Sequence, residues 1–198
     1  MKERPTLFSA PMVLALLAGR KTMTRRIVHE RHLVERGGDP MDPRSAESVP
    51  WSGPSPFGKP GDRLWVKETW RHGLPVDTSE RSYRGGDTRT VLYRSTDGEL
   101  LGLKKGWKPS IFMPRWASRI DLEVTEIRIE CLQKITEEDA MAEGVATETD
   151  GIIRGCVGGV FSSHRHAFAA LWDRINGKRA AWKSDPWVWV VSFRRLRP

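Results

Sequence analysis

The sequence predicts a mixed α/β domain of the α+β type, in which a small, twisted, mainly antiparallel sheet or barrel carries helices on its surface. Residues 119–131 alternate between apolar and polar side chains, as a half-buried strand does. Residues 10–18 and 163–176 have the apolar spacing of helices, and residues 187–193 are apolar on both faces, which indicates a central strand. The chain of 198 residues shows no internal repeat and no linker, so we expect one domain.

The first predicted element is a helix over residues 10–18. Ser9 precedes it as an N-cap, Pro11 falls in its permissive first turn, and Gly19 follows at its C-terminal cap. The helix is apolar nearly all round, so we expect it to be buried. A buried helix would hold the segment that follows, residues 21–26, in a fixed place.

Three strands are predicted before the closing one. A Pro-Gly-Asp turn signal precedes residues 63–68, and a short strand follows at residues 90–94. In the long strand 119–131 the apolar side changes phase at Thr125 and Glu126. This slip predicts a bulge in a bent strand, a feature that small barrels require.

Two more helices are predicted in the second half. Thr136 caps a short helix that runs to Glu143 and stops at Gly144, with a hydrophobic staple across its first turn. The last helix begins near Ser163 and has an apolar stripe at i, i+3, i+4 and i+7 that predicts its core face. The stripe consists of Phe168, Leu171, Trp172 and Ile175.

Four segments lack a clear period. Residues from about 29 to 60 are rich in proline and are predicted to form a loop or a lid, with the irregular insertion itself at about 29–58. A second irregular insertion covers about 71–88. Residues 104–114 form a basic, tryptophan-containing loop, and residues 146–160 are rich in glycine and unpatterned.

Composition limits the partners and the compartment. The formal net charge is +8 and the pI about 9.9, which favours nucleic acid over a membrane, because no strongly amphipathic basic helix is present. No apolar run approaches the roughly 18 residues of a membrane span, and no signal-peptide pattern is found. Cys131 and Cys156 do not make a disulfide framework, so we expect a cytoplasmic protein. The sequence gives no indication of a protein partner.

The nine tryptophans are several times ordinary usage. Aromatic side chains among cations can stack on unpaired bases, but core packing is the usual role. We expect core positions for those in periodic apolar patterns, which are Trp172, Trp187 and Trp189. The better stacking candidates lie in loop-like surroundings and are Trp51, Trp70, Trp107 and Trp182.

The segment after the first helix carries the clearest chemical signal. Lys21 and Thr24 stand three residues apart, in a cluster of four cations that also includes Arg20, Arg25 and Arg26. A partly buried lysine among cations has a lowered pKa and can act as a base, and a hydroxyl beside it can be a nucleophile. The alternative is a basic helix end that satisfies its own carbonyls and binds phosphate through charge alone.

Residues 19–26 read Gly-Arg-Lys-Thr-Met-Thr-Arg-Arg, which resembles the Gly-x-Lys-x-x-(Glu/Thr)-x-Arg signature of ASCH domains, relatives of the PUA RNA-binding fold. The order of elements is also similar, from the leading helix to a closing strand of the Trp-Val-x-x-Phe type. The chain most resembles the longer ASCH-domain proteins of bacteria and their phages, over most of its length except 29–58 and 71–88. The resemblance implies one PUA-like domain, residues 1–198, with a small, mainly antiparallel β-barrel and flanking helices.

Small bacterial ASCH proteins are amidohydrolases that remove the acetyl group from N4-acetylcytidine. The resemblance places their catalytic set on Lys21, Thr24 and Glu143. Many ASCH proteins carry Glu where this chain has Thr24, so the threonine is the more telling match. Glu143 ends a predicted helix, where the dipole disfavours an anion, and this suits it to donating a proton or to pairing with Lys21 as one titrating unit. The chain is longer than those enzymes, and its extra loops can reshape the pocket.

Several other side chains are candidates for binding. Arg26 completes the motif and is interpreted as a phosphate or carboxylate anchor, with a surface salt bridge as the alternative. Chain order suggests that Arg115 and Trp116 line the same pocket. The candidates for binding substrate or nucleic acid are Arg20, Arg25, Arg26, Trp70, Arg115 and Trp116.

The sequence predicts no cofactor and no metal. His164 and His166, with Cys156 upstream, lack a fourth ligand at useful spacing. The glycines at 155, 158 and 159 show neither a P-loop nor a dinucleotide-binding pattern. We find no Ser-His-Asp set in the sequence order.

Three functions follow from these observations. The first is an amidohydrolase that removes an acyl group from an N4-acylcytidine, with a modified nucleoside or RNA as its partner. The second is a non-catalytic module whose pocket holds a modified base while basic loops hold phosphate. The third is a ribonuclease that uses Lys21 and the surrounding arginines on the scissile phosphate.

Overall fold

The computed structural model describes residues 1–29, 49–50, 55–72, 91–100, 102, 104–149, 151–156 and 158–196. Within these residues, one six-stranded sheet runs in the order β1–β4–β7–β11–β2, and β3 pairs with the far end of β7. Its strands are β1 (Glu3–Leu7), β2 (Met23–Ile27), β3 (Val49–Pro50), β4 (Arg63–Lys67), β7 (Asp121–Cys131) and β11 (Trp187–Leu196). The fold is mixed α+β with mainly antiparallel pairing, as the sequence predicts, although β1 and β4 are parallel.

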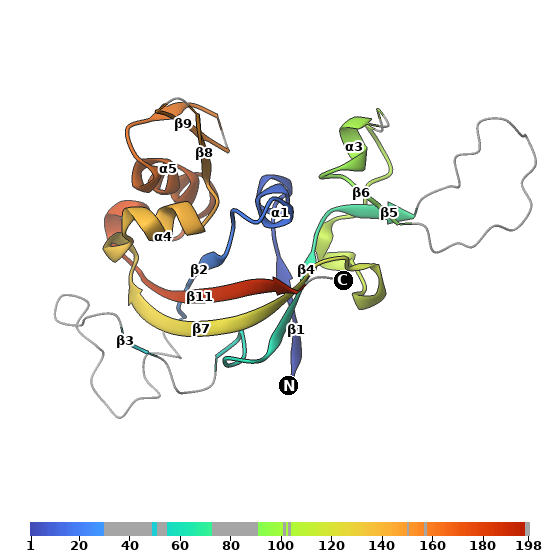
Figure 1. Cartoon of the computed structure of the whole chain (residues 1–198), viewed down its shortest axis with the longest axis horizontal. Coiled ribbons are helices and arrows are strands. Elements are labelled where there is room, and N and C mark those ends of the chain that lie inside the picture. Colours follow the sequence, from blue (N-terminus) through green and yellow to red (C-terminus); the bar gives the residue numbers. More distant parts are fainter. Residues whose placement is uncertain are drawn as a thin grey trace, which may run out of the picture.

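In the described part of the chain, two small sheets and four helices flank the main sheet. The small sheets consist of β5 (Trp70–His72) with β6 (Val91–Tyr93), and of β8 (Ala146–Thr149), β9 (Ile152–Gly155) and β10 (Val160–Phe161). The helices are α1 (Ala10–Leu17), α3 (Asp97–Leu100), α4 (Glu137–Ala142) and α5 (His164–Asn176). Figure 1 shows α4, α5 and the β8–β9 hairpin at one end of the long curved strands β7 and β11, and β5, β6 and α3 at the other.

The long strands carry the predicted bulge. Ser192 pairs with Glu126 and Phe193 pairs with Val124, so Thr125 is the extra residue on β7. The apolar residues change phase at this position because an inserted residue turns the following side chains to the opposite face. β11 lies between β7 and β2, which confirms it as a central strand.

The predicted barrel is not found as a closed structure. In the described part of the chain the sheet ends at β1 on one side and at β2 on the other, with no backbone ladder between them. The side chain of Arg26, on β2, donates from NH2 to the carbonyl of Leu7, at the end of β1, at 2.7 Å. The side chain of Arg26 thus bridges the two edges.

The helices largely follow their sequence signals. Thr136 Oγ1 accepts a bond from the amide of Asp139 at 3.1 Å, and Ile135 and Ala140 are buried as the staple predicts. Ser163 Oγ caps α5 in the same way. Ser9 occupies the N-cap position of α1 but makes no side-chain capping bond.

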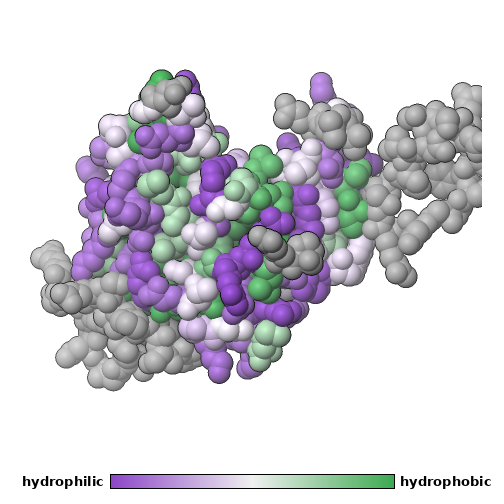
Figure 2. All heavy atoms as spheres, viewed as in Figure 1, coloured by the Kyte–Doolittle hydropathy of each residue, from purple (hydrophilic) through white to green (hydrophobic). Residues whose placement is uncertain are grey.

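Two helical residues depart from the predicted burial. Leu14 is 43% exposed, so α1 is buried on one face rather than all round. In α5, Ile175 is 62% exposed although Phe168, Leu171 and Trp172 of the same stripe are buried, because Ile175 lies in the last turn of the helix. Figure 2 shows hydrophilic side chains over most of one face, with hydrophobic ones at α1 and beside the β5–β6 hairpin.

Several elements depart from the sequence interpretation. The segment after α1 is not a basic helix end, because Met23–Ile27 form strand β2. β1 lacks a clear alternation and was not predicted, and residues 146–160 contain three short strands rather than an unpatterned loop. The predicted loop or lid at 29–58 and the insertion at 71–88 lie mostly outside the described residues.

The sequence predicts only in part which tryptophans are buried. Trp172, Trp187 and Trp189 are buried in the main core, as expected. Trp70 is also buried, in a second cluster with Met113 and Ala117, so it is not free to stack on a base. Trp51 lies outside the described residues. No described helix is long and apolar enough to cross a bilayer.

Candidate active site

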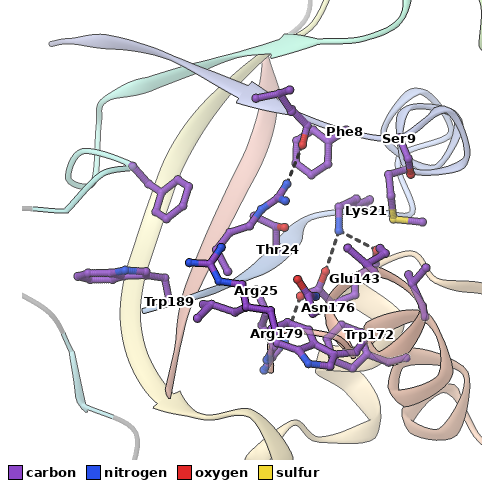
Figure 3. A pocket seen from close by; sticks show the side chains of 18 of the residues that line it. Phe8, Ser9, Lys21, Thr24, Arg25, Glu143, Trp172, Asn176, Arg179 and Trp189 are labelled. Carbon is purple, nitrogen blue, oxygen red and sulfur yellow. Dashed lines mark hydrogen bonds and ion pairs between the residues drawn. The ribbon is translucent and has the colours of Figure 1, made fainter. Parts of the chain in front are cut away.

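A cavity of about 580 Å³ lies where β1, β2 and the start of α1 face α4 and α5 (Figure 3). Its volume falls in the range of small-molecule sites. The polar part of its wall comes from Ser9, Lys21, Thr24, Arg25, Arg26, His29, Glu143, Asn176 and Arg179. The apolar part comes from Leu7, Phe8, Met12, Ile27, Pro56, Phe57, Phe168, Leu171, Trp172, Ile175 and Trp189.

Lys21 lies on this wall and is only 3% exposed. Its Nζ donates to Glu143 Oε2 at 2.8 Å, to the carbonyl of Glu143 at 2.8 Å and to the carbonyl of Met23 at 2.7 Å. These three acceptors match the three donors of an ammonium group. Lys21 therefore also caps the C-terminal end of α4, not that of α1.

Glu143 is 122 residues from Lys21 in the sequence, and the close packing of α4 on the segment after α1 brings them together. The amide of Thr22 donates to the carbonyl of Ala142 at 2.8 Å. Gly144 follows with a φ of +67°, and a Cβ there would lie 2.9 Å from Lys21 Cβ and 3.0 Å from Ala15 Cβ. Only glycine fits this approach without a shift of its neighbours.

The Lys21–Glu143 pair is buried on the cavity wall. Burial lowers the pKa of Lys21 from its ordinary value, the Glu143 carboxylate opposes this effect, and Arg26 and Arg25 add to it. Glu143 Oε1 is buried and has no hydrogen-bond partner in the described residues, and Arg25 NH1 lies 3.5 Å from it as an ion pair. One oxygen of Glu143 thus holds Lys21, and the other remains an acceptor without a donor.

Arg25 belongs to a buried ionic network behind the cavity. Its NH2 lies 2.6 Å from Glu130 Oε1 and 2.5 Å from Asp139 Oδ2, and Arg128 contacts the same two carboxylates. Burial would lower the pKa of Arg25, but Glu143, Glu130 and Asp139 together raise it. The side chain of Arg25 is fully buried, so it orients the carboxylates and is not an exposed phosphate ligand.

Thr24 lies on β2 with its backbone paired to Val191 of β11, and it is 4% exposed. Its side chain lines the cavity, and Figure 3 shows it between Phe8 and the Lys21–Glu143 pair. Within the described part of the chain, its hydroxyl has no hydrogen-bond partner. A hydroxyl in this position is available to a ligand.

Two further cations line the cavity without a carboxylate partner in the described residues. Arg26 contacts the Phe8 ring at 5.3 Å and the carbonyl of Leu7, and burial lowers its pKa from the usual arginine value. Arg179 follows α5 and its NH2 lies 3.3 Å from His29 Nδ1. Both are suited to an anionic group of a ligand.

The remaining predicted binding residues lie elsewhere. Arg20 is exposed and donates to the carbonyl of Ala146 at 3.4 Å. Arg115 pairs with Glu3 and Asp121, and neither it nor Trp116 or the buried Trp70 lines the cavity. The prediction from chain order is wrong for Arg115 and Trp116, because the turn that carries them packs beside β5.

Sequence reasoning missed Phe8, Phe168 and Arg179 as parts of the cavity. Phe168 and Trp172 were predicted as core residues, and they are both core and cavity wall. Phe8 and Arg179 stand just after β1 and α5, outside any motif. Nothing in the local sequence indicates that these two segments approach the same space.

No metal site emerges in the described residues, which contain no group of three or more His, Cys, Asp or Glu arranged to hold an ion. His164 contacts Glu137 at 3.1 Å, and His166 contacts Ser162 at 2.6 Å, so the two histidines serve separate local contacts.

No protein-family model, curated protein or solved structure matches this chain. Its function must therefore be argued from the cavity.

Proposed function

We propose that this protein is an ASCH-like amidohydrolase of the PUA-like superfamily that removes the acyl group from an N4-acylcytidine such as N4-acetylcytidine. The observation that carries the proposal is the meeting of Lys21 and Glu143 at 2.8 Å on the wall of a cavity to which Thr24 also contributes. The ASCH resemblance assigned a catalytic role to the same three residues. Their convergence supports that assignment.

The first chemical step uses Thr24 as the nucleophile. Its Oγ1 attacks the acyl carbonyl carbon, and its proton passes to Lys21 in the neutral form. Burial favours that form, since it lowers the pKa of Lys21. The proton that Lys21 gives up beforehand leaves along its 2.8 Å contact with Glu143, so the two side chains act as one unit.

The second step breaks the bond between the acyl carbon and N4. The leaving N4 takes a proton from the Lys21–Glu143 pair and departs as the amino group of cytidine, while the acyl group remains as an ester on Thr24. Water then hydrolyses this ester, releases the acid and restores the threonine hydroxyl. Glu143 Oε1, which lacks a donor in the described residues, is placed to accept a bond from the N4 hydrogen before cleavage.

The rest of the cavity fits a nucleoside. Phe8, Phe168 and Trp172 offer aromatic surface against which a pyrimidine can pack. Arg26 and Arg179 provide donors for a sugar hydroxyl or a phosphate.

One observation favours a non-catalytic pocket instead. The ammonium of Lys21 already has three acceptors, an arrangement that a purely structural lysine would also show. In that case the cavity would bind a modified base without turnover. A ribonuclease is less well supported, because Arg25 is occupied by Glu130 and Asp139 and the Glu143 carboxylate would repel a phosphate.

The test is chromatography of N4-acetylcytidine and a small panel of other N4-acylcytidines after incubation with the wild-type protein. We expect release of cytidine by the wild type and a loss of at least about 100-fold in Thr24→Ala, because the nucleophile is gone. Thr24→Ser keeps a hydroxyl and should retain measurable activity. Mass spectrometry of quenched reactions should find the acyl group on Thr24 in the wild type only.

Thr22→Ala is the matched control, since Thr22 is exposed, two residues away and not part of the cavity wall. Ligand binding is followed separately through the change in total tryptophan fluorescence, to which Trp172 and Trp189 on the cavity wall contribute. Binding without release by the wild type would make the protein a reader of modified bases. Full activity in Thr24→Ala would remove the nucleophile from the mechanism.

A further inference from the structure

A second surface of the molecule carries large apolar side chains in water. It is built on two short 3-10 turns, Ser110–Phe112 and Arg115–Ala117, beside the β5–β6 hairpin. Ile111 is 61% exposed, Phe112 69% and Trp116 57%. Their neighbours in the sequence, Met113 after Phe112 and Ala117 after Trp116, are buried under the hairpin. The turns are therefore anchored by two side chains, while their apolar neighbours point outward.

Trp116 is held in a defined orientation. Its ring meets the buried Trp70 edge-on, with centroids 5.8 Å apart and an interplanar angle of 89°. It also lies 5.8 Å from the ring of His72 at 31°. Pro114 precedes the turn and Pro109 precedes the neighbouring one, which restricts the backbone further. An exposed ring fixed in this way loses little entropy when a flat ligand stacks on it.

Cations surround these aromatic side chains. Residues 104–119 contain Lys104, Lys105, Lys108, Arg115 and Arg119 and no aspartate or glutamate. Arg115 and Arg119 are neutralised by carboxylates. The three lysines are exposed and have no carboxylate partner among the described residues. Lys108 Nζ lies 5.1 Å from the ring of the buried Trp70, and the exposed Trp116 packs on that same ring, so positive charge lies near exposed aromatic surface.

We propose that this surface, the 104–116 patch, binds single-stranded nucleic acid. Bases stack on Trp116 and Phe112, and backbone phosphates contact Lys104, Lys105 and Lys108. Proteins that bind single strands without sequence preference combine these two features, a stacking platform and a cationic track. The net charge of +8 adds long-range attraction for the polymer. The proposal does not depend on the chemistry of the cavity.

The geometry favours a single strand over other partners. The turns are too short to enter a duplex groove as a helix would, so a duplex would offer the rings no base to stack on. A membrane-inserting tip keeps its cations away from the apolar side chains, whereas here Lys108 lies over Trp70, the ring against which the exposed Trp116 packs. An acidic peptide would use the lysines but would leave the aromatic faces unused.

The test is fluorescence anisotropy of a labelled oligouridine of about 12 nucleotides, a length within the span of one single-strand module. We expect Trp116→Ala to weaken binding about tenfold, and Phe112→Ala to do the same, because each removes one stack. Replacing Lys104, Lys105 and Lys108 together by Ala should lower the salt dependence, the slope of log K against log salt, by about 2.

The control variants change residues outside the patch that have the same charge or a similar exposure. Lys59, Lys178 and Lys183 are exposed and lie outside the patch, so their triple Ala variant has the same net charge as the patch variant. Val160→Ala removes a 63% exposed apolar side chain elsewhere. Circular dichroism verifies that each variant is folded.

Three outcomes would overturn the proposal. Equal losses in the patch and control lysine variants would reduce the binding to bulk charge. Unchanged affinity in both aromatic variants would remove the stacking platform. Sedimentation of the protein with phosphatidylserine-containing vesicles, without binding to the oligonucleotide, would make the patch a membrane contact.

Discussion

Two ionic clusters lie in different parts of the molecule, and they differ in how completely their groups are paired. In the cluster under the β5–β6 hairpin, Glu68 Oε1 accepts from Arg119 Nε at 2.9 Å, and Oε2 accepts from Arg119 NH2 and Ser95 Oγ. Arg119 NH1 donates to Thr96 Oγ1, and the guanidinium lies 3.8 Å from the Tyr93 ring centroid. Every polar atom of this pair has a partner.

The cavity cluster is incomplete by comparison. Glu143 is as deeply buried as Glu68, with side-chain exposures of 5% and 3%. Yet Glu143 Oε1 lacks a hydrogen-bond donor in the described residues, and the cluster opens onto a cavity that Thr24 also lines. A buried group without a partner costs free energy and persists when it has another use. Completeness of pairing, not burial, separates a structural cluster from a candidate site.

The largest expected effects come from neutralising the central carboxylate of each cluster. Glu68→Gln should lower the free energy of unfolding by about 2 to 3 kcal/mol, because Arg119 cannot lose its charge and stays partly buried without a counter-ion. Glu143→Gln should cost less stability, since Lys21 can release its proton. It should nevertheless lower hydrolysis by at least about 100-fold, through loss of the proton donor.

Urea unfolding and turnover of N4-acetylcytidine, measured on both variants, give the comparison directly. Glu68→Gln should retain the activity of the wild type at temperatures where it is folded. If both variants lost stability and activity in the same proportion, the distinction between the two clusters would not hold.

A smaller effect is expected at Gly144, which separates α4 from Lys21. Gly144→Ala introduces a Cβ 2.9 Å from Lys21 Cβ at a φ of +67°, so it combines backbone strain with a steric clash. We expect a loss of about 1 to 3 kcal/mol and a fall in activity, because the clash moves Lys21 relative to Glu143.

Gly151→Ala is the matched control for this prediction. Gly151 has a φ of +72°, but nothing lies within 4 Å of the position of a Cβ. It should show the strain of about 1 kcal/mol without the loss of activity. Equal activity in the two variants would mean that the spacing of Lys21 and Glu143 does not depend on Gly144.

The sequence is informative where the signal is local. The caps at Thr136 and Ser163 and the phase change at Thr125 each depend on neighbouring residues, and each is found in the structure. The spacing of Lys21 and Thr24 indicates a site, and the family resemblance adds Glu143. All three line one cavity, although only the structure places Glu143 beside Lys21.

The sequence is uninformative where contacts are distant. The sequence makes Arg25 a candidate for binding substrate or nucleic acid, but it does not show the partners of Arg25, Glu130 and Asp139, which are 105 and 114 residues away. Trp70 stood among charged residues and looked exposed, yet Met113 and Ala117 fold over it. Residues 146–160 form strands too short and too exposed to produce an alternating pattern.

The smallest expected effect concerns the titration of Lys21. Burial lowers the pKa of its amine, and the Glu143 carboxylate raises it by favouring the charged form. Glu143→Gln removes the raising contribution only, so the midpoint should move to lower pH than in the wild type, not higher. Glu68→Gln should leave the midpoint of the Lys21 titration unchanged.

The ¹³Cε resonance of Lys21, followed by NMR against pH, reports this titration without requiring turnover. A midpoint in Glu143→Gln at or above that of the wild type would show that the pair is not electrostatically coupled in this sense. The cavity cluster would then lose the shared proton on which the proposed mechanism depends.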